Sequence, residues 1–310
     1  MKPHPTDMGL TPDQITTFQR QGYLVVEDVV PQATRDAVEA EYADLMRTFA
    51  AQRGIGWRGS FLETLRAVHG AGHDWFQSLD ITLPGDRIAP DTPFHYGPAV
   101  HGLLTCPEIV EIAADLVGPE VTSTPIQHLR IKPPAQTVTG DAPAHITHTL
   151  WHRDRAVAHE EADGTRMVTV WVAMTDATVE NGCLVVQPMD EGQAMLPHCP
   201  LEQTSIPPGL LRGIEVALPV RAGGVVLLHP MIPHAARPNV TDGFRWSFDL
   251  RYQQSGQPTG RAHFPDFPVR GAPVPDWMTV RDRWLAARAA AASAPHIPLH
   301  RWTSDSPHCA

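Results

Sequence analysis

The stretch Trp151-His152-Arg153-Asp154 places an imidazole and a carboxylate one residue apart. On an extended backbone, residues i and i+2 point to the same face of a strand, so His152 and Asp154 can reach one metal ion. A third ligand has to come from far along the chain. The best candidate is His234, at the end of His229-Pro-Met-Ile-Pro-His234. These three side chains are the predicted metal ligands.

The His-x-Asp motif is weak by itself. The chain has 17 histidines in 310 residues, so a match can arise by chance. The competing interpretation is a surface strand that carries two solvated polar residues. Together with His234, however, the motif gives two histidines and one carboxylate with open positions opposite them. That is the ligand set of non-haem Fe(II) oxygenases.

Alternating sequence patterns on both sides of this stretch predict a β-rich core. In residues 126–132 the polar side chains of His128, Arg130 and Lys132 alternate with Leu129 and Ile131. This pattern indicates a strand with one apolar and one polar face, and the polar face meets either solvent or a cavity. Further strands are predicted around Trp151 and at residues 167–173, 183–186, 215–220, 224–228 and 245–252. Short strands separated by turns favour a sandwich or jelly roll.

Helical patterns lie mainly before this core. Thr11-Pro12-Asp13-Gln14 has the residues of a capping box, and Gly22 is suited to end the helix that follows. The other predicted elements are a strand at 23–30, helices at 33–53, 107–117 and 277–292, loops at 57–59 and 84–98, and a loose C-terminal tail. No internal repeat is visible. We therefore expect one α+β, mainly β, domain over 1–310, with helices over about 10–118, the core over about 120–255 and a C-terminal helix and tail over about 275–310.

Composition narrows the classes of partner. The net charge is −10 and there is no block of lysine or arginine, which argues against nucleic acid and anionic membranes. The most apolar run, residues 224–228, is too short to span a bilayer. A small-molecule substrate is therefore expected, and the oligomeric state is left open. Four scattered cysteines and the lack of an apolar leader predict a reducing, cytoplasmic location, and the scatter argues against a disulfide frame or a structural zinc site.

Several motifs follow one another in order from the Thr11 helix to about Tyr252. They are Leu10 to Phe18, Gly22-Tyr-Leu-Val-Val26, Lys132-Pro-Pro134, Trp151 to Asp154, Val170-Trp171, Asp176-Ala-Thr178, Glu180 to Leu184, Gly224 to His229, His234, Pro238-Asn239 and Arg245. Together these motifs resemble the phytanoyl-CoA dioxygenase family of Fe(II)- and 2-oxoglutarate-dependent oxygenases.

This resemblance implies a double-stranded β-helix in which His152, Asp154 and His234 bind Fe(II). It also implies that Arg245 binds the distal carboxylate of 2-oxoglutarate, as a planar guanidinium can do with two hydrogen bonds. Arg251 is the rival for this role on the same strand. Trp171, His128 and Arg130 match positions near the cosubstrate, and each is alternatively an ordinary core or surface residue.

The chain also departs from the family pattern. Pro188-Met189-Asp190-Glu191 replaces a common Pro-Gly-Ser-His, which puts a substrate-side loop in doubt. Ala236 stands where a hydroxyl residue is frequent, so one hydrogen bond to 2-oxoglutarate is lost and Arg245 becomes more important. Asp154 is retained, which argues against a halogenase.

The expected reaction uses O2 to hydroxylate, or otherwise oxidise, a C–H bond of a small specialised metabolite, with release of succinate and CO2. A coenzyme A ester is disfavoured because no basic docking patch is visible. The expected pocket walls are Trp57-Arg58, residues 84–96 and Met231. Two other classes remain open: a cupin-like isomerase or hydrolase that uses the same ligands without redox chemistry, and a non-catalytic binding protein. Dependence on 2-oxoglutarate would distinguish the oxygenase from the isomerase or hydrolase. A tight metal site would distinguish it from the non-catalytic binding protein.

Overall fold

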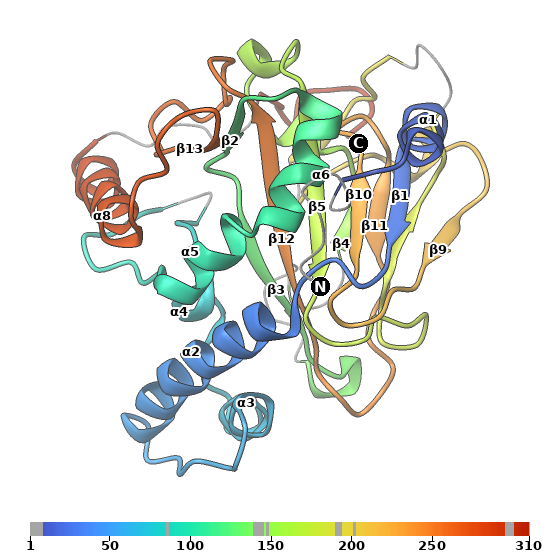
Figure 1. Cartoon of the computed structure of the whole chain (residues 1–310). Coiled ribbons are helices and arrows are strands. Elements are labelled where there is room, and N and C mark those ends of the chain that lie inside the picture. The colour runs from blue at the N-terminus through green and yellow to red at the C-terminus, as the bar shows by residue number, and fades with distance from the viewer. Residues whose placement is uncertain are drawn as a thin grey trace.

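The protein is built around two antiparallel β-sheets, with most of its helices gathered on one side of the larger sheet (Figure 1). The computed structural model describes residues 9–84, 87–138, 146, 149–189, 194–200, 203–294 and 301–309. The mixture of helices and mostly antiparallel strands agrees with the predicted α+β class.

The larger sheet has seven strands in the order β1-β10-β5-β12-β2-β13, and β3 also pairs with β12. Its strands are β1 (Tyr23–Val26), β2 (Val121–Ser123), β3 (His128–Lys132), β5 (Met167–Ala173), β10 (Val225–Leu228), β12 (Arg245–Gln254) and β13 (Phe267–Arg270). The smaller sheet has the order β4-β11-β6-β9 and consists of β4 (Thr149–His152), β6 (Leu184–Val186), β9 (Val216–Leu218) and β11 (His234–Ala236). A separate pair joins β7 (Cys199–Pro200) and β8 (Thr204–Ser205).

Side chains on β5 and β12 alternate between the two faces of the larger sheet, and two separate apolar cores result. On β12, Trp246, Phe248, Leu250 and Tyr252 belong to the apolar core shared with the helices. On β5, Trp171 and Ala173 belong to a second core, shared with β6, β9, β10 and β11, between the two sheets. The inward row of β12, in contrast, is polar and consists of Arg245, Ser247, Asp249, Arg251 and Gln253. The sheet therefore turns its apolar face to the helices and a polar row towards the interior between the sheets.

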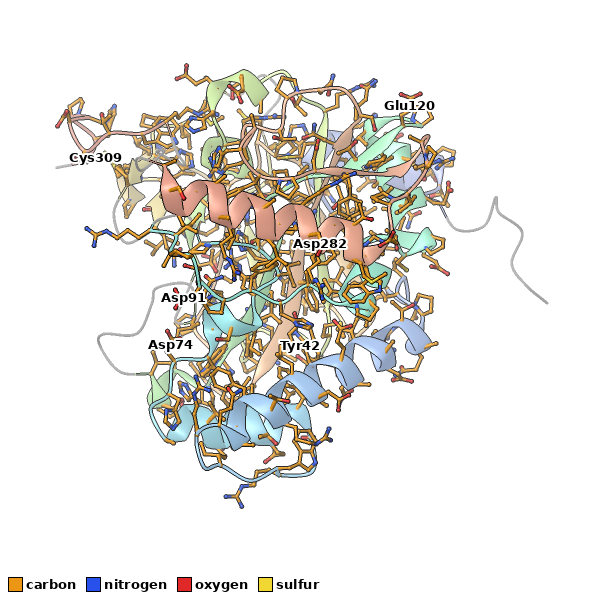
Figure 2. All side chains as sticks on the ribbon, turned by 90° about the vertical axis from the view of Figure 1, so that its left-hand side faces the viewer. Tyr42, Asp74, Asp91, Glu120, Asp282 and Cys309 are labelled. Carbon is orange, nitrogen blue, oxygen red and sulfur yellow. A yellow bond between two sulfur atoms is a disulfide. The ribbon has the colours of Figure 1, made fainter. Side chains whose placement is uncertain are left out.

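The helices begin largely where the sequence indicates. Helix α1 (Pro12–Gln21) has the predicted capping box between Thr11 and Gln14, and Gly22 ends it with a left-handed backbone at φ 80°. The other long helices are α2 (Gln32–Ala51), α6 (Pro107–Val117) and α8 (Trp277–Ser293). Tyr42 of α2, labelled in Figure 2, packs its ring 5.4 Å from that of Trp246, so α2 lies directly against the sheet.

Between residues 54 and 104, where loops were predicted only at 57–59 and 84–98, the described residues also form three helices that the sequence did not reveal. They are α3 (Phe61–Gly70), α4 (Phe76–Leu79) and α5 (Pro98–Leu104). Ser60 caps α3 by accepting a hydrogen bond from the backbone N–H of Glu63, and Gly97-Pro98 begins α5. These helices are at most ten residues long, so their periodic patterns were too short to stand out between proline and glycine residues. The described residues also include four 3₁₀ turns: η2 (Ala135–Thr137), η3 (Asp154–Val157), η4 (Glu160–Ala162) and η5 (Pro208–Leu210).

The C-terminal tail is anchored over residues 301–309, so the prediction of a loose tail is wrong for this part. Cys309 forms a disulfide with Cys199, 110 residues away in sequence. Trp302 donates a hydrogen bond to the carbonyl of Ala156 at 2.8 Å, and its ring stacks on His198. The expectation against a disulfide frame missed this bond, because the spacing of cysteines does not reveal which of them meet in the fold. The cysteine count consequently gives no support for a reducing compartment.

Among the residues that the structure describes, none of the helices combines the length and apolar character needed to cross a lipid bilayer.

Candidate active site

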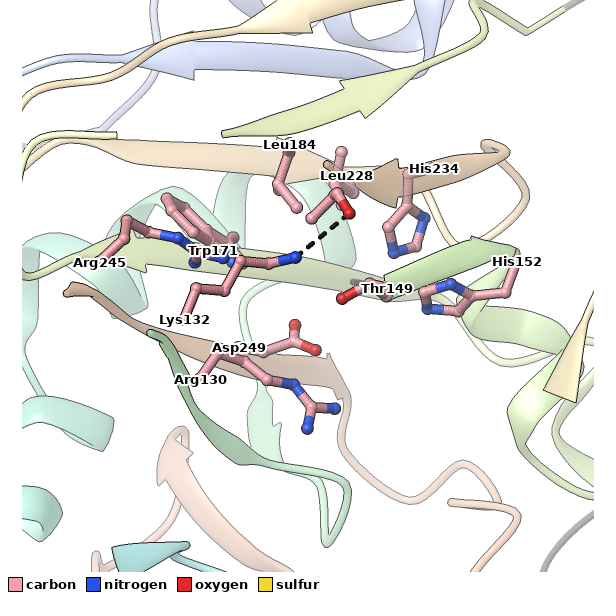
Figure 3. A pocket seen from close by; sticks show the side chains of 11 residues that line it. Arg130, Lys132, Thr149, His152, Trp171, Leu184, Leu228, His234, Arg245 and Asp249 are labelled. Carbon is pink, nitrogen blue, oxygen red and sulfur yellow. Dashed lines mark hydrogen bonds between the residues drawn. The ribbon is translucent and has the colours of Figure 1, made fainter. Parts of the chain in front are cut away.

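The three predicted metal ligands come together in the structure. His152 ends β4 and His234 begins β11, and the two residues are direct partners across this antiparallel pair. Their Nε2 atoms lie 3.7 Å and 3.8 Å from Oδ1 of Asp154. One donor atom from each of the three residues falls within 4.8 Å of the others, which is compact enough to surround one ion. Figure 3 shows both imidazole rings at the same end of a pocket.

Backbone carbonyls orient the two imidazoles. Nδ1 of His152 is 2.8 Å from the carbonyl of Leu150, and Nδ1 of His234 is 3.2 Å from that of Ile232. An imidazole whose Nδ1–H donates to a carbonyl presents an unprotonated Nε2, which is the form that binds a metal. Both Nε2 atoms face Asp154, so the donor set fits a divalent transition metal.

Asp154 lies on a different local structure from His152. The strand ends at His152 and Asp154 opens the 3₁₀ turn η3, so the two ligands are not on one continuous strand. Arg153 between them keeps an extended backbone, with φ −117° and ψ 136°, which preserves the alternation that brings both side chains to one site. The backbone N–H of Arg153 donates to Nε2 of His198 at 3.0 Å and fixes this junction.

Burial and neighbouring charges favour the metal-binding protonation states. Burial, reinforced by neighbouring His234, lowers the pKa of His152 to about 3, so its imidazole is neutral at physiological pH. Burial alone would raise the pKa of Asp154, but the Arg251 guanidinium and the two imidazoles hold it below its ordinary value. A neutral imidazole and an ionised carboxylate are the states that bind metal.

Arg245 lies in the wall of the same pocket as the two histidines. Its side chain is 1% exposed, and Nη1 donates to the hydroxyl of Ser247 at 2.7 Å. Its Nε has no hydrogen-bond partner among the described residues. Burial lowers the pKa of Arg245 to about 9, and no carboxylate among the described residues offsets this effect. A carboxylate bound in the pocket would satisfy both the charge and the free donor.

Trp171, Leu184 and Leu228 form apolar walls of this pocket, as Figure 3 shows. The Arg245 guanidinium carbon lies 5.1 Å from the centre of the Trp171 ring, within the range of a cation–π contact. Trp171 is 3% exposed. The predicted pair of Arg245 and Trp171 is therefore brought together at the pocket.

Lys132 lines the pocket, although the sequence analysis placed it only on the polar face of a strand and gave it no role in the site. Its Nζ donates to the carbonyls of Ala236 and Arg237, at 3.2 Å and 2.9 Å, and burial, followed by the nearby Arg245 and Arg130, lowers its pKa well below the ordinary value. The ammonium is thus bound beside the position where Ala236 replaces a hydroxyl residue. Polar alternation on the β3 sequence was the signal that pointed to it.

The predicted cavity residues on β3 have different surroundings. Arg130 lines the pocket, together with Asp249 and Thr149. His128 does not line it: Nδ1 of its ring is 3.0 Å from Oδ2 of Asp80 and 3.3 Å from the hydroxyl of Thr82. Burial lowers the pKa of His128 despite this carboxylate. His128 therefore connects β3 to the segment that follows α4.

Among the described residues, none from the loops expected to wall the pocket lines it. Trp57 lies under the Arg47 guanidinium at 4.3 Å, and neither Met231 nor a described residue of the 84–96 segment lines the pocket. Gly85 and Asp86 are outside the described residues, as are Asp190 and Glu191 of the departing segment 188–191. Met189 of that segment donates its backbone N–H to the carbonyl of Gln21, which ties it to the end of α1.

Comparison with known proteins identifies the family. The family model for phytanoyl-CoA dioxygenase (PhyH) matches residues 18–247, which is most of the chain. The chain belongs to the phytanoyl-CoA dioxygenase family. The human peroxisomal phytanoyl-CoA dioxygenase is 23% identical over 259 residues, covering 78% of this chain and 68% of the human protein.

Solved structures agree with the fold expected of the phytanoyl-CoA dioxygenase family. The non-haem monooxygenase ThoJ has a TM-score of 0.60 at 18% identity, and the match covers 90% of this chain and 97% of ThoJ. The epimerase SnoN, solved with Fe³⁺, α-ketoglutarate and nogalamycin RO, has a TM-score of 0.56 at 21% identity, covering 84% of this chain and 89% of SnoN. At these identities the likeness concerns the backbone fold.

Family membership and the His152/Asp154/His234 cluster confirm the predicted enzyme class. The protein is an oxidoreductase of the Fe(II)- and 2-oxoglutarate-dependent dioxygenases.

Proposed function

We propose that this phytanoyl-CoA dioxygenase family member oxidises a C–H bond of a small specialised metabolite and releases succinate and CO2. The observation that carries the proposal is a metal-binding triad beside a pocket whose wall contains a buried arginine that no carboxylate among the described residues neutralises. A metal-dependent isomerase or hydrolase needs the triad but has no evident use for that arginine.

His152, Asp154 and His234 would hold the iron. Three protein ligands on one face leave room for the cosubstrate and O2 on the other. Bound Fe(II) supplies the oxidising chemistry, with 2-oxoglutarate decarboxylated to succinate as the substrate is oxidised. The protein's own contribution is to fix the ligand atoms, orient both organic molecules and keep water out of the pocket.

Arg245 would bind the distal carboxylate of 2-oxoglutarate. Its guanidinium is fully enclosed, so a charge-assisted pair there would be strong. Trp171, Leu184 and Leu228 would cover the methylene groups of the cosubstrate, and Arg130 would add positive charge to the wall. His128 is left out of this cofactor site because its ring is bound to Asp80.

We further propose that the two sheets form a double-stranded β-helix. The apolar cluster between β5, β10 and the strands of the smaller sheet supports this arrangement, as do the structural matches with TM-scores of 0.60 and 0.56. In such a barrel the inward row of β12 faces the interior between the sheets, where Arg245 meets the pocket.

The substrate is proposed to be small because the sequence contains no block of basic residues to hold a large anionic carrier such as coenzyme A. Asp249 and Thr149 are polar pocket residues that have no assigned contact with the cosubstrate and would remain for this substrate.

The test is an anaerobic titration of the metal-free protein with Fe(II) and then 2-oxoglutarate, followed by visible absorbance. We expect a weak charge-transfer band only when both are present. In Arg245→Met, half-saturation of this band should need about 10- to 100-fold more 2-oxoglutarate, the range expected when a hydrogen-bonded charge pair is removed. Arg245→Lys, which keeps the charge and loses the planar fork, should lie between Arg245→Met and the wild type.

The outcomes separate the three candidate functions. Iron binding without a band would indicate a metal site that does not use 2-oxoglutarate, and hence a non-redox enzyme. An absence of iron binding would indicate a non-catalytic protein. An unchanged band titration in Arg245→Met would refute the assigned role of Arg245.

A further inference from the structure

Arg251 was the sequence rival of Arg245 for the cosubstrate, and the structure gives it a different set of contacts. Its side chain is 3% exposed and does not line the pocket. Nη2 of Arg251 instead forms an ion pair with Oδ1 of Asp154, whose side chain is fully buried. Oδ1 is the same oxygen that faces the Nε2 atoms of His152 and His234.

The second oxygen of Asp154 is held from the adjacent strand. The hydroxyl of Thr169 donates to Oδ2 of Asp154. Thr169 on β5 and Arg251 on β12 are direct partners in the sheet register. One pair of facing residues therefore supplies a donor to each oxygen of the carboxylate.

Asp154 needs such contacts to keep one orientation. The terminal torsion of an aspartate is broad, so an unheld carboxylate samples many orientations about its axis. Two donors on opposite oxygens fix its plane, and the charged donor contributes the stronger hydrogen bond. Oδ1 is thereby kept towards both imidazoles.

Arg251 is itself held at both ends. The side-chain amide of Gln127 accepts from the backbone N–H of Arg251 and donates to its carbonyl, each at 2.9 Å. On the pocket side, Oδ2 of Asp249 lies 3.7 Å from Nη2 of Arg251. Gln127 thus fixes the backbone of Arg251, and both carboxylates lie beside Nη2. Nε and Nη1 have no hydrogen-bond partner among the described residues.

We infer that Arg251 is a positioning residue for the metal ligand Asp154, assisted by Thr169, and that it does not bind 2-oxoglutarate. This inference rests on the metal site of the proposed function. Partners that orient metal ligands typically change metal affinity or activity by about 10- to 100-fold when they are replaced. Arg245 and Arg251 would then have separate tasks on one face of β12, although both are buried arginines six residues apart.

The test compares these two arginines by the same substitution in the full-length protein. Metal-free wild type, Arg251→Met and Arg245→Met are titrated with Co(II), whose visible d–d absorption reports coordination geometry and needs no turnover. We expect Arg251→Met to bind Co(II) about 10- to 100-fold more weakly and with an altered band shape. Arg245→Met should retain the wild-type Co(II) affinity and spectrum, while its 2-oxoglutarate affinity falls.

Two further variants should weaken Co(II) binding by smaller amounts, and one of them replaces Arg251→Met if that variant does not fold. Thr169→Val removes the neutral donor at nearly constant volume and should weaken Co(II) less than Arg251→Met does. Arg251→Lys keeps a buried positive charge, and should weaken Co(II) by several-fold because an ammonium lacks the planar fork. Far-UV circular dichroism and urea midpoints establish that each variant is folded. If Arg251→Met does not fold, folded Arg251→Lys gives the decisive measurement.

Wild-type Co(II) affinity and band shape in folded Arg251→Met, or in folded Arg251→Lys if the former does not fold, would overturn the inference. Equal weakening of Co(II) in Arg245→Met and Arg251→Met would overturn it as well, because the effect would then follow from the loss of any buried charge on β12. Failure of the wild type itself to bind Co(II) would refute the proposed metal site, and is distinguishable because no variant is needed to observe it.

Discussion

The disulfide between Cys199 and Cys309 predicts a large and reductant-sensitive contribution to stability. It closes a loop with a sequence separation of 110 residues. In the chain-entropy model, a closed loop of this length restricts the unfolded state by about 5 kcal/mol at 25 °C, and the loss of native disulfides typically costs about 2–5 kcal/mol. We expect Cys309→Ser to lower the free energy of unfolding by about 3–5 kcal/mol.

The other contacts of the C-terminal tail determine whether loss of the disulfide changes the folded state or only the unfolded state. Arg301 pairs with Asp163 at 2.6 Å and 2.7 Å and donates to the carbonyl of Arg155, while Trp302 donates to that of Ala156. These contacts do not depend on the disulfide, so the tail should stay docked in folded Cys309→Ser. The effect should therefore arise mainly from a less restricted unfolded chain.

Urea unfolding at pH 7, with and without reductant, measures this contribution. Cys199→Ser and Cys309→Ser should lose equal stability, and the double variant should lose no more than either single one. Reductant should bring the wild type to the same level and leave the variants unchanged. Cys106 and Cys183 are free and buried, so unfolded, unreduced protein should show two reactive thiols. Four thiols, or equal urea midpoints for wild type and Cys309→Ser, would refute the reasoning.

Two further predictions concern single residues. Gly182 has φ 84°, and an added Cβ would lie 2.3 Å from the carbonyl oxygen of Arg237. Gly182→Ala should therefore lower the free energy of unfolding in urea by at least about 2 kcal/mol. The control Gly54→Ala, at φ 72° with open space around the added Cβ, should lower it by about 1 kcal/mol. Glu41 accepts hydrogen bonds from His95 and from two backbone N–H groups of α5; burial opposes them, yet its pKa lies below the ordinary 4.5. Ionised Glu41 thus contributes stability above pH 4.5 that is lost as pH falls through its folded pKa, so Glu41→Gln should be destabilised at pH 7 and approach the wild type below pH 4. A constant difference between pH 7 and pH 3 would contradict this assignment.

The sequence was sufficient to predict the residues with distinctive chemistry. His152, Asp154 and His234 were identified because few residue types bind metals, and Arg245 because an arginine at that spacing after His234 resembles a family site. Thr169 carried no such signal, since a hydroxyl in an otherwise apolar strand is ordinary. Its role depends on the register that places it opposite Arg251, which is a long-range property of the sheet.

The different contacts of Arg245 and Arg251 could not be predicted from the sequence. Both occupy the inward face of β12, and both are almost fully buried. The pattern could therefore predict that each points inward, but not which anion each one meets. Arg245 lies at the pocket, whereas Arg251 lies against Asp154 because the 3₁₀ turn η3 brings that carboxylate over the β5–β12 pair. The same limitation applies to Cys199 and Cys309, whose pairing depends on where the tail returns.

The polar inward row of β12 also explains why the helices are needed for the site. Burying two guanidinium groups in one strand is unfavourable unless other contacts hold the strand in place. The outward row of Trp246, Phe248, Leu250 and Tyr252 supplies such contacts by packing into the helical core. Because side chains alternate with a period of two, a shift of β12 by one residue would move all four apolar residues out of that core. The apolar face therefore fixes the register that brings Arg251 to Asp154, and the geometry of the metal site depends on packing on the opposite side of the sheet.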